Sequence, residues 1–267
     1  MSQQPTTVFI TGASRGIGRA LVEAYLKRPS HTVIASVRDP ESTPLKGLET
    51  GEGSRLMVVK IEAKSSSDPV AAVEQIKAEG ITALDIVIAV AGINSSDAWA
   101  EVQDIDPAKL EEIFQVNTFS FVRLLHAVYP LLKAVADDKE RRPGRQPPKL
   151  LVLSSNAGQT GDMAVEIPLP GRDPIKLRVG AYGASKAALN NLVRRAHLES
   201  PWLACWMMNP GFVQTDTGNA HARTWGIGQA MQEVEPTAKM LMSKVDEATL
   251  EETAGKFINF DGEEMTF

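Results

Sequence analysis

Short apolar, β-branched runs alternate along this chain with longer segments in which hydrophobic residues recur at helical spacing. The runs lie at Thr7–Thr11, Thr32–Val37, Leu56–Ile61, Leu84–Ala91, Leu150–Ser154, Leu203–Met208 and Lys256–Phe260. Several expected helix starts carry a possible cap followed by proline, as in Asp68-Pro69, Asp106-Pro107 and Glu235-Pro236. This alternation predicts an α/β fold in which seven parallel strands form a doubly wound sheet with helices on both faces.

The segment from Pro107 to about Ala136 is predicted to be a long helix whose apolar residues cover more than one face. Because such a helix must be buried on several sides, the sheet alone cannot cover it. We expect a second copy of the chain to cover the remainder, which would give a homodimer or homotetramer through residues 107–136. Burial under the chain's own loops is the alternative.

Length and charge limit the classes of protein that fit. A chain of 267 residues with 43% hydrophobic content can bury one full core, so we predict a single domain over residues 1–267. The net charge of −5 and the pI near 5.5 leave no broad basic surface, which makes nucleic acid and acidic membranes poor partners. A small-molecule partner fits better.

The remaining composition favours a cytoplasmic protein. Cys205 is the only cysteine and stands among apolar residues, so we expect a buried thiol and a reducing compartment. The N-terminus shows no export leader, and the longest apolar run, Ile86–Ile93, is too short to span a bilayer. The four histidines show no ligand spacing, so no metal is expected.

A glycine-rich turn follows the first predicted strand. It reads Thr11-Gly12-Ala13-Ser14-Arg15-Gly16-Ile17-Gly18 and precedes an amphipathic helix expected over residues 19–28. Glycines here allow positive φ and let the backbone approach a pyrophosphate, which then lies at the helix N-terminus. Their position between a strand and a helix predicts a dinucleotide site. The expected contacts in the turn are Gly12, Ser14, Arg15, Gly16, Ile17 and Gly18.

The residue after the second predicted strand indicates which dinucleotide binds. Arg38 stands where sites selective for NAD carry an acidic residue for the ribose 2′-hydroxyl. A guanidinium there favours a 2′-phosphate, and Arg15 could hold the same phosphate from the other side. We therefore predict NADP(H) over NAD(H). A 2′-hydroxyl bound by Asp39 is the competing interpretation.

Tyr182 and Lys186 are four residues apart in a segment that reads as a helix, so both side chains lie on one face. A nearby cation can lower the pKa of a tyrosine and make it a usable proton donor near neutral pH. A packed tyrosine followed by a surface lysine would produce the same spacing. The meaning of the pair therefore depends on the other motifs of the chain.

The glycine-rich turn, Asn117 in a long helix, a serine pair at a strand end and the Tyr182 and Lys186 pair occur in an order that resembles the short-chain dehydrogenase/reductase family. The resemblance covers nearly the whole chain and implies a Rossmann fold with catalytic Asn117, Ser155, Tyr182 and Lys186. Tyr182 would donate a proton, and Ser155 would hold the substrate oxygen, with Ser154 as the alternative. Lys186 would favour the tyrosinate and bind the nicotinamide ribose. Asn117 would bend its helix and bind a water that links the lysine to solvent.

The same resemblance adds cofactor contacts beyond the glycine-rich turn. They are Glu62, Ala91, Gly92, Pro210, Gly211, Val213 and Thr215, together with Asn117, Tyr182 and Lys186. One departure is Ala89-Val90-Ala91-Gly92, which stands where the family carries one or two asparagines. We therefore expect the loss of a side-chain hydrogen bond that steadies the central sheet.

The 26 residues between Ser155 and Tyr182 form a longer segment than most family members have. Residues 159–179 are predicted to be an insertion that covers an apolar substrate as a lid, and a plain surface loop is the alternative. This insertion and the motifs at 210–216 and 255–262 resemble the sniffer and C-factor-like branch, and within it fungal ketoreductases of an aromatic polyketide. The implied walls of a bulky, apolar substrate pocket are Trp99, Asn156, Met163, Phe212 and Trp225.

The function that follows is NADPH-dependent reduction of a ketone or aldehyde, in a secondary-metabolite pathway. One alternative is a redox-neutral isomerase or cyclase that keeps the cofactor site as a scaffold. Such a protein would not need Tyr182 and Lys186, so their presence counts against it. Another alternative is a non-catalytic regulator that binds NADPH and uses the 107–136 helix to dock a partner.

Overall fold

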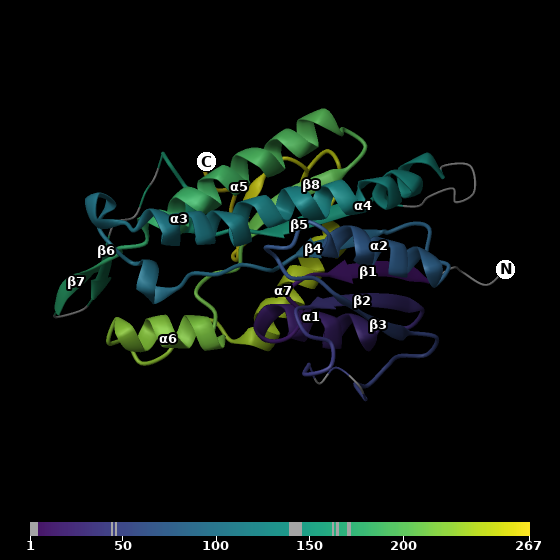
Figure 1. Cartoon of the computed structure of the whole chain (residues 1–267), viewed down its shortest axis with the longest axis horizontal. Helices are drawn as coiled ribbons and strands as arrows, with labels where there is room; N and C mark the ends of the chain where they lie inside the picture. Colours follow the sequence, from purple (N-terminus) through teal and green to yellow (C-terminus); the bar gives the residue numbers. More distant parts are fainter. Residues whose placement is uncertain are drawn as a thin grey trace.

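A seven-stranded parallel sheet forms the centre of the protein, and Figure 1 shows it between two helical layers in a computed structural model. The structure describes residues 5–43, 45, 47–138, 146–161, 163, 166–169 and 172–267. The strand order is β3-β2-β1-β4-β5-β8-β9. The strands are β1 (Thr6–Ile10), β2 (His31–Val37), β3 (Arg55–Lys60), β4 (Ile86–Ala89), β5 (Lys149–Leu153), β8 (Ala204–Asn209) and β9 (Phe257–Asn259). The predicted fold class is confirmed, and each strand lies within a few residues of its expected position.

The helices that cover the sheet divide between its two faces. They are α1 (Gly16–Leu26), α2 (Asp68–Ala78), α3 (Pro107–Phe114), α4 (Ser120–Asp137), α5 (Gly180–Glu199), α6 (Asp216–Thr224) and α7 (Val234–Glu247). Buried side chains of α2, α4 and α5 share one core with the sheet, and those of α1 and α7 share the other. Helix α6 lies away from the sheet, at the end of the molecule where the hairpin also lies (Figure 1).

Alternate residues of the central strands point into opposite cores. Phe9 belongs to the core under α2, α4 and α5, whereas its neighbours Val8 and Ile10 belong to the core under α1 and α7. Cys205 is buried in β8, as predicted, and burial raises the pKa of its thiol. Burial on both faces explains why these strands read as continuous apolar runs rather than as alternating ones.

The predicted 107–136 helix consists of α3 and α4 joined by a π-helical turn, η3 (Gln115–Phe119). By length and composition alone the stretch Pro107–Asp137 could cross a membrane, but the core helix of a soluble fold passes the same test. Here Leu124, Val128 and Leu132 of α4 are buried in the sheet core. Phe119, Val122 and Tyr129 remain partly exposed, and association through this helix stays a prediction.

Residues within the predicted insertion form an antiparallel hairpin of β6 (Glu166–Leu169) and β7 (Arg172–Lys176), which the sequence pattern did not indicate. The hairpin lies at the end of the molecule that carries α6 and the start of α3 (Figure 1). Ala100 pairs with Val179 in an isolated bridge, which connects the base of the hairpin to the loop after β4. Whether residues 159–179 act as a lid stays a prediction, as does the single domain over residues 1–267.

Candidate active site

The glycine-rich turn after β1 has the geometry that an anion site requires. Gly12 and Gly16 have φ of +66° and +56°, a region that favours glycine. A β-carbon at Gly18 would lie 2.3 Å from the carbonyl oxygen of Gly12, so the turn can close only on glycine. The N-cap residue of α1, Arg15, makes no side-chain capping bond. The first N–H groups of α1 can therefore bind an anion.

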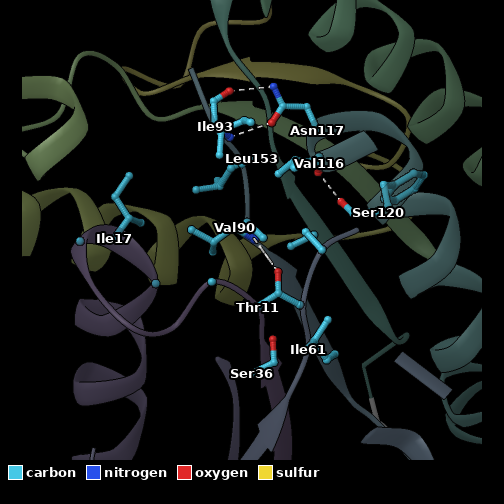
Figure 2. A pocket seen from close by; sticks show the side chains of 18 of the residues that line it. Thr11, Ile17, Ser36, Ile61, Val90, Ile93, Val116, Asn117, Ser120 and Leu153 are labelled. Carbon is cyan, nitrogen blue, oxygen red and sulfur yellow. Dashed lines mark hydrogen bonds between the residues drawn. The ribbon is translucent and has the colours of Figure 1, made fainter. Parts of the chain in front are cut away.

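A cavity of about 620 Å³ runs from this turn along the carboxyl ends of the strands to α5 (Figure 2). Its walls include most of the predicted cofactor residues, namely Gly12, Ser14, Arg15, Gly16, Ile17, Gly18, Arg38, Glu62, Ala91, Gly92, Asn117, Tyr182, Lys186, Pro210 and Thr215. Its size and its place at the switch point of the sheet suit a small organic cofactor. The residues present therefore fit a nicotinamide dinucleotide.

Two predicted cofactor contacts do not line this cavity. Val213 is buried, and its backbone pairs with Gln232 in an isolated bridge. Gly211 has a φ of +81° and lies against the side chain of Gln232. The sequence motif correctly locates the turn after β8, but of its four predicted contacts only Pro210 and Thr215 line the cavity, next to Asp216.

Three charged residues, Arg15, Arg38 and Glu62, line the end of the cavity that lies away from Tyr182 and Lys186. Arg38 is exposed at the edge of the cavity after β2. Arg15 does not point to the same place, because its Nη1 forms an exposed ion pair with Asp216 Oδ2 at 3.1 Å. This pair connects the glycine-rich turn to the start of α6. Glu62 lines the cavity, and its Oε1 accepts a bond from the backbone N–H of Lys64 at 3.4 Å.

The end of β4 receives support that the sequence did not lead us to expect. Thr11 Oγ1 accepts hydrogen bonds from the backbone N–H groups of Val90 at 3.1 Å and Ala91 at 3.3 Å. Figure 2 shows this threonine between the two strand ends. A hydroxyl from the end of β1 therefore supports the end of β4. The side-chain bond that the usual asparagines would make is still missing, because positions 89–91 carry only alanine and valine.

Asn117 lies in the π-helical turn and is almost fully buried. Its Oδ1 accepts from the backbone N–H of Ile93 at 2.8 Å, and its Nδ2 donates to the Ile93 carbonyl at 2.9 Å and to Ser185 Oγ at 3.0 Å. A π-turn inserts one residue into a helix and is frequent at functional sites. The break in helical regularity is the feature that the resemblance implied for Asn117.

Gly92 lies where two catalytic candidates approach each other. A β-carbon there would be 3.3 Å from Asn117 Oδ1 and 3.6 Å from Lys186 Nζ. The first of these contacts is tighter than ordinary packing, so a larger residue would displace the asparagine. The absence of a side chain at Gly92 therefore leaves room for the Asn117 and Lys186 side chains beside the cavity.

Tyr182 and Lys186 lie on the same face of α5, and the Lys186 ammonium is 5.8 Å from the centroid of the Tyr182 ring. Lys186 Nζ donates to the Leu153 carbonyl at 2.8 Å, and burial lowers its pKa to about 8. Burial also raises the pKa of Tyr182, and a hydrogen bond with the Ser155 side chain opposes this shift. The net shift of the tyrosine pKa is therefore upward rather than downward as expected, because desolvation of the phenol has the largest effect.

The two serines after β5 have different surroundings. Ser154 is buried, and its hydroxyl donates to Asn190 Oδ1 at 2.5 Å. Ser154 also contributes to the cavity wall, but this bond directs its hydroxyl to the asparagine. Ser155 Oγ donates to Asn156 Oδ1 at 3.3 Å and accepts from the Ala157 N–H at 3.2 Å, and its side chain lies close enough to Tyr182 to oppose the rise of the tyrosine pKa. Ser155 does not itself line the cavity, so the choice of Ser155 over Ser154 stays a prediction.

Of the residues expected to form substrate walls, Trp99, Phe212 and Trp225 come together in one aromatic cluster. Asn156 is exposed next to Ser155, and Met163 is exposed on the insertion. Sequence reasoning missed two further residues, Asn94 and His221, which hold this cluster to the cavity wall. Asn94 follows the predicted end of β4 by three residues, and a polar residue so close to a strand end was the signal that could have identified it as a site residue.

Comparisons with known proteins agree with this geometry. The sequence model described as short chain dehydrogenase matches residues 6–166. This protein belongs to the short-chain dehydrogenase family. The match includes the glycine-rich turn, Asn117 and Ser155. The family resemblance predicted from the sequence is confirmed.

Relatives extend the likeness to the rest of this short-chain dehydrogenase. A norsolorinic acid ketoreductase of Dothistroma septosporum is 36% identical over 95% of this chain and 89% of the relative. The norsolorinic acid ketoreductase of Aspergillus parasiticus is 34% identical over 98% of this chain and 91% of the relative. A short-chain dehydrogenase of Neurospora crassa is 37% identical over 97% of each chain.

Solved structures show the same fold at lower identity. The carbonyl reductase Sniffer of D. melanogaster superposes with a TM-score of 0.79 at 22% identity, covering 99% of this chain and all of that one. An NADPH-bound carbonyl reductase from chicken fatty liver gives a TM-score of 0.77 at 23% identity, with 99% and 100% coverage. The short-chain dehydrogenase fold is therefore present over almost the whole chain.

Proposed function

We propose that this short-chain dehydrogenase reduces a ketone or aldehyde to an alcohol with NADPH as the hydride source. The observation that carries the proposal is that Tyr182 and Lys186 line one end of a cavity whose other end is the glycine-rich turn, with Ser155 beside Tyr182. A single cavity can thus hold a dinucleotide on the helix N-terminus while its reactive ring lies beside a proton donor.

The chain's own residues would polarise and protonate the substrate. When bound, NADPH would supply a hydride to the carbonyl carbon. The Tyr182 hydroxyl would give its proton to the carbonyl oxygen, so that the products are an alcohol and NADP⁺. The Ser155 hydroxyl, which lies beside Tyr182, would hold the same oxygen and stabilise the negative charge that develops on it.

Lys186 would act on Tyr182 rather than on the substrate. Its Nζ has one shown hydrogen bond, to the Leu153 carbonyl, and the ammonium can donate two more. A positive charge 5.8 Å from the tyrosine ring would favour the tyrosinate left after proton transfer. Asn117 would hold the Ile93 backbone, and with it Gly92, at the edge of the cavity.

Selectivity for NADPH is proposed from the charge at the far end of the cavity. The exposed guanidinium of Arg38 lies at the end of β2, where an acidic residue would favour NADH. Arg15 could add a second contact if it left Asp216. An NADPH-bound carbonyl reductase among the similar structures supports the choice.

The substrate that we propose is a bulky aromatic carbonyl compound, and the pathway is one of secondary metabolism. The names of two norsolorinic acid ketoreductases among the relatives support this choice, as do the aromatic residues Trp99, Phe212 and Trp225 near the cavity. A cytoplasmic location and a homo-oligomer remain predictions.

The test is to follow the loss of NADPH absorbance with a panel of aromatic ketones, aldehydes and quinones. Tyr182→Phe is run alongside, and NADPH binding is measured for both proteins by cofactor fluorescence. Turnover by the parent that vanishes in Tyr182→Phe, with NADPH binding kept, supports the proposal. Binding without turnover across the panel would favour the redox-neutral or regulatory alternatives. Failure to bind NADPH would overturn the proposed cofactor.

A further inference from the structure

Four aromatic side chains from three separate segments meet beside the catalytic end of the cavity. Trp99 lies in the loop after β4, Phe212 follows β8, His221 lies in α6, and Trp225 follows α6. The indoles of Trp99 and Trp225 are stacked, with centroids 5.2 Å apart and planes 18° apart. The His221 ring is 4.6 Å from Trp99, and Phe212 is 5.4 Å from Trp225. We call these four residues the aromatic cluster.

Asn94 fixes the aromatic cluster to the cavity wall. It lines the cavity, its Oδ1 accepts from Trp99 Nε1 at 2.9 Å, and its backbone carbonyl bonds His221 Nε2 at 2.7 Å. A carbonyl can only accept, so His221 carries its proton on Nε2. Burial lowers the pKa of His221, which keeps the ring neutral. The aromatic cluster is therefore next to the cavity rather than at a remote surface.

The short stretch from Trp225 to Gly228 lies between two attached positions, His221 in α6 and the buried Ala230. Of its nine residues, α6 buries Gly218, His221 and Ala222. Beyond Trp225, Gly226 and Gly228 have φ of +71° and +78°, with nothing within 4 Å of a β-carbon built at either. The other end is fixed, since a β-carbon at Gly218 would lie 2.0 Å from the Val213 carbonyl. Open space at the two glycines leaves room for Trp225 and its neighbours to shift while His221 stays bonded to Asn94.

We infer that the stacked indoles of Trp99 and Trp225 are the specificity-determining contact for a flat aromatic substrate, which binds by separating them and stacking between their faces. This inference rests on the proposed reduction of carbonyl compounds. A planar ring in that position replaces one ring-to-ring contact with two, whereas an aliphatic group of the same size cannot stack. A shift of Trp225 and the glycine-containing stretch after it supplies the space, while Asn94 keeps Trp99 and His221 in place.

The test compares 2-acetylnaphthalene with cyclohexyl methyl ketone as substrates for Trp225→Leu, Trp225→Phe and Trp99→Leu. Leucine removes the ring and phenylalanine keeps one. Loss of one stacking partner is expected to raise KM for the naphthyl ketone about 10-fold in both leucine variants. KM for the aliphatic ketone should stay within about twofold, and Trp225→Phe should recover most of the loss.

Trp202→Leu is the matched control, because Trp202 packs on Tyr129 and Lys133 and lies outside the aromatic cluster. It should leave KM for both ketones unchanged. Equal changes for the two ketones, or no change for the naphthyl ketone, would overturn the inference. Unaltered NADPH binding in every variant shows that the fold is kept.

If the parent reduces neither ketone, the proposed function fails for these substrates, and binding then decides the inference. Calorimetric titration of 2-acetylnaphthalene into the parent and Trp225→Leu measures stacking without turnover. Binding that is lost in the leucine variant and kept in Trp225→Phe supports an aromatic site. Binding that is absent in the parent, or equal in all variants, rejects it.

Discussion

The side chain of Asn117 bonds both backbone groups of Ile93, accepting from the N–H at 2.8 Å and donating to the carbonyl at 2.9 Å. This pair of bonds joins the π-helical turn to the strand end that forms one wall of the cavity (Figure 2). The same amide donates to Ser185 Oγ, whose hydroxyl in turn donates to the Tyr182 carbonyl. Asn117 therefore connects the cavity wall to the helix that carries the proposed proton donor.

Asn117→Asp should weaken both the fold and the activity. The carboxylate keeps an acceptor for Ile93 N–H but loses the donor, and it places one oxygen against the Ile93 carbonyl. Burial of this mismatch should lower the free energy of unfolding by about 1–3 kcal/mol, measured by urea denaturation. Displacement of the wall should lower kcat about 10- to 100-fold.

Asn219→Asp is the control for this change, because the bond shown for Asn219 uses only its Oδ1 as an acceptor from Ala230 N–H. An aspartate keeps that bond. If Asn219→Asp lowers the free energy of unfolding as much as Asn117→Asp does, the loss does not come from the contacts of Asn117 with Ile93.

Ser155→Ala and Ser154→Ala should separate catalysis from stability. Ser155 lies beside Tyr182 and is the proposed holder of the substrate oxygen, so its removal should lower kcat by about 100-fold with little effect on unfolding. Ser154 is buried against Asn190, so its removal leaves a buried acceptor unpaired and should cost about 1–3 kcal/mol of stability. The two measurements are steady-state kinetics and urea unfolding. The reverse pattern would assign the catalytic role to Ser154.

Most of the fold and much of the site could be predicted because their signals are local. The strands are apolar runs, and Gly12, Gly16 and Gly18 follow β1 directly. The hairpin β6–β7 was missed, since it depends on pairing within an insertion that has no clear alternation. The contacts of Asn94 with His221, and of Thr11 with Val90, join positions 127 and 79 residues apart, and no local pattern reveals such pairs.

Thr11→Val should show how much the end of β4 depends on one hydroxyl. Valine keeps the shape of threonine but leaves the N–H groups of Val90 and Ala91 without their acceptor. We expect a loss of about 1–3 kcal/mol in the free energy of unfolding, with weaker NADPH binding. Thr11→Ser keeps the hydroxyl and should retain NADPH affinity. Equal NADPH affinity in both variants would show that the hydroxyl does not support the cofactor wall.

The pH dependence of the free enzyme should report Lys186. Because burial lowers its pKa to about 8, the ammonium is lost as the pH rises through that value. If the charge assists Tyr182, kcat/KM for reduction falls above about pH 8. Lys186→Met should show low activity and should lack this fall. A parent profile that is flat across that value would mean that the charge of Lys186 does not govern the reaction.

The free energy of unfolding should rise with pH over the range in which kcat/KM falls, and Lys186 is the cause of both changes. The folded-state pKa is below the unfolded value of 10.5, so the unfolded chain binds more protons between about pH 8 and that value. The free energy of unfolding therefore rises with pH across this window, on the order of 3 kcal/mol from this group. Subtracting the curve of Lys186→Met isolates the contribution. A difference that does not change with pH would show that the lysine is not desolvated.

Cofactor selectivity should respond differently to Arg38 and to Asp216. Arg38→Asp removes the proposed phosphate partner and offers an acceptor for a ribose hydroxyl, so the ratio of NADPH to NADH affinity should fall about 100-fold. Asp216→Asn tests whether Arg15 can help to bind the 2′-phosphate, because the substitution releases Arg15 from its exposed ion pair. Since such a pair contributes little, freeing Arg15 should raise the same ratio only about two- to fivefold, and added salt should reduce the gain. Fluorescence titrations of both variants with both cofactors measure the ratios. An unchanged ratio in Arg38→Asp would reject the proposed selectivity, and an unchanged ratio in Asp216→Asn would show that Arg15 does not reach the phosphate.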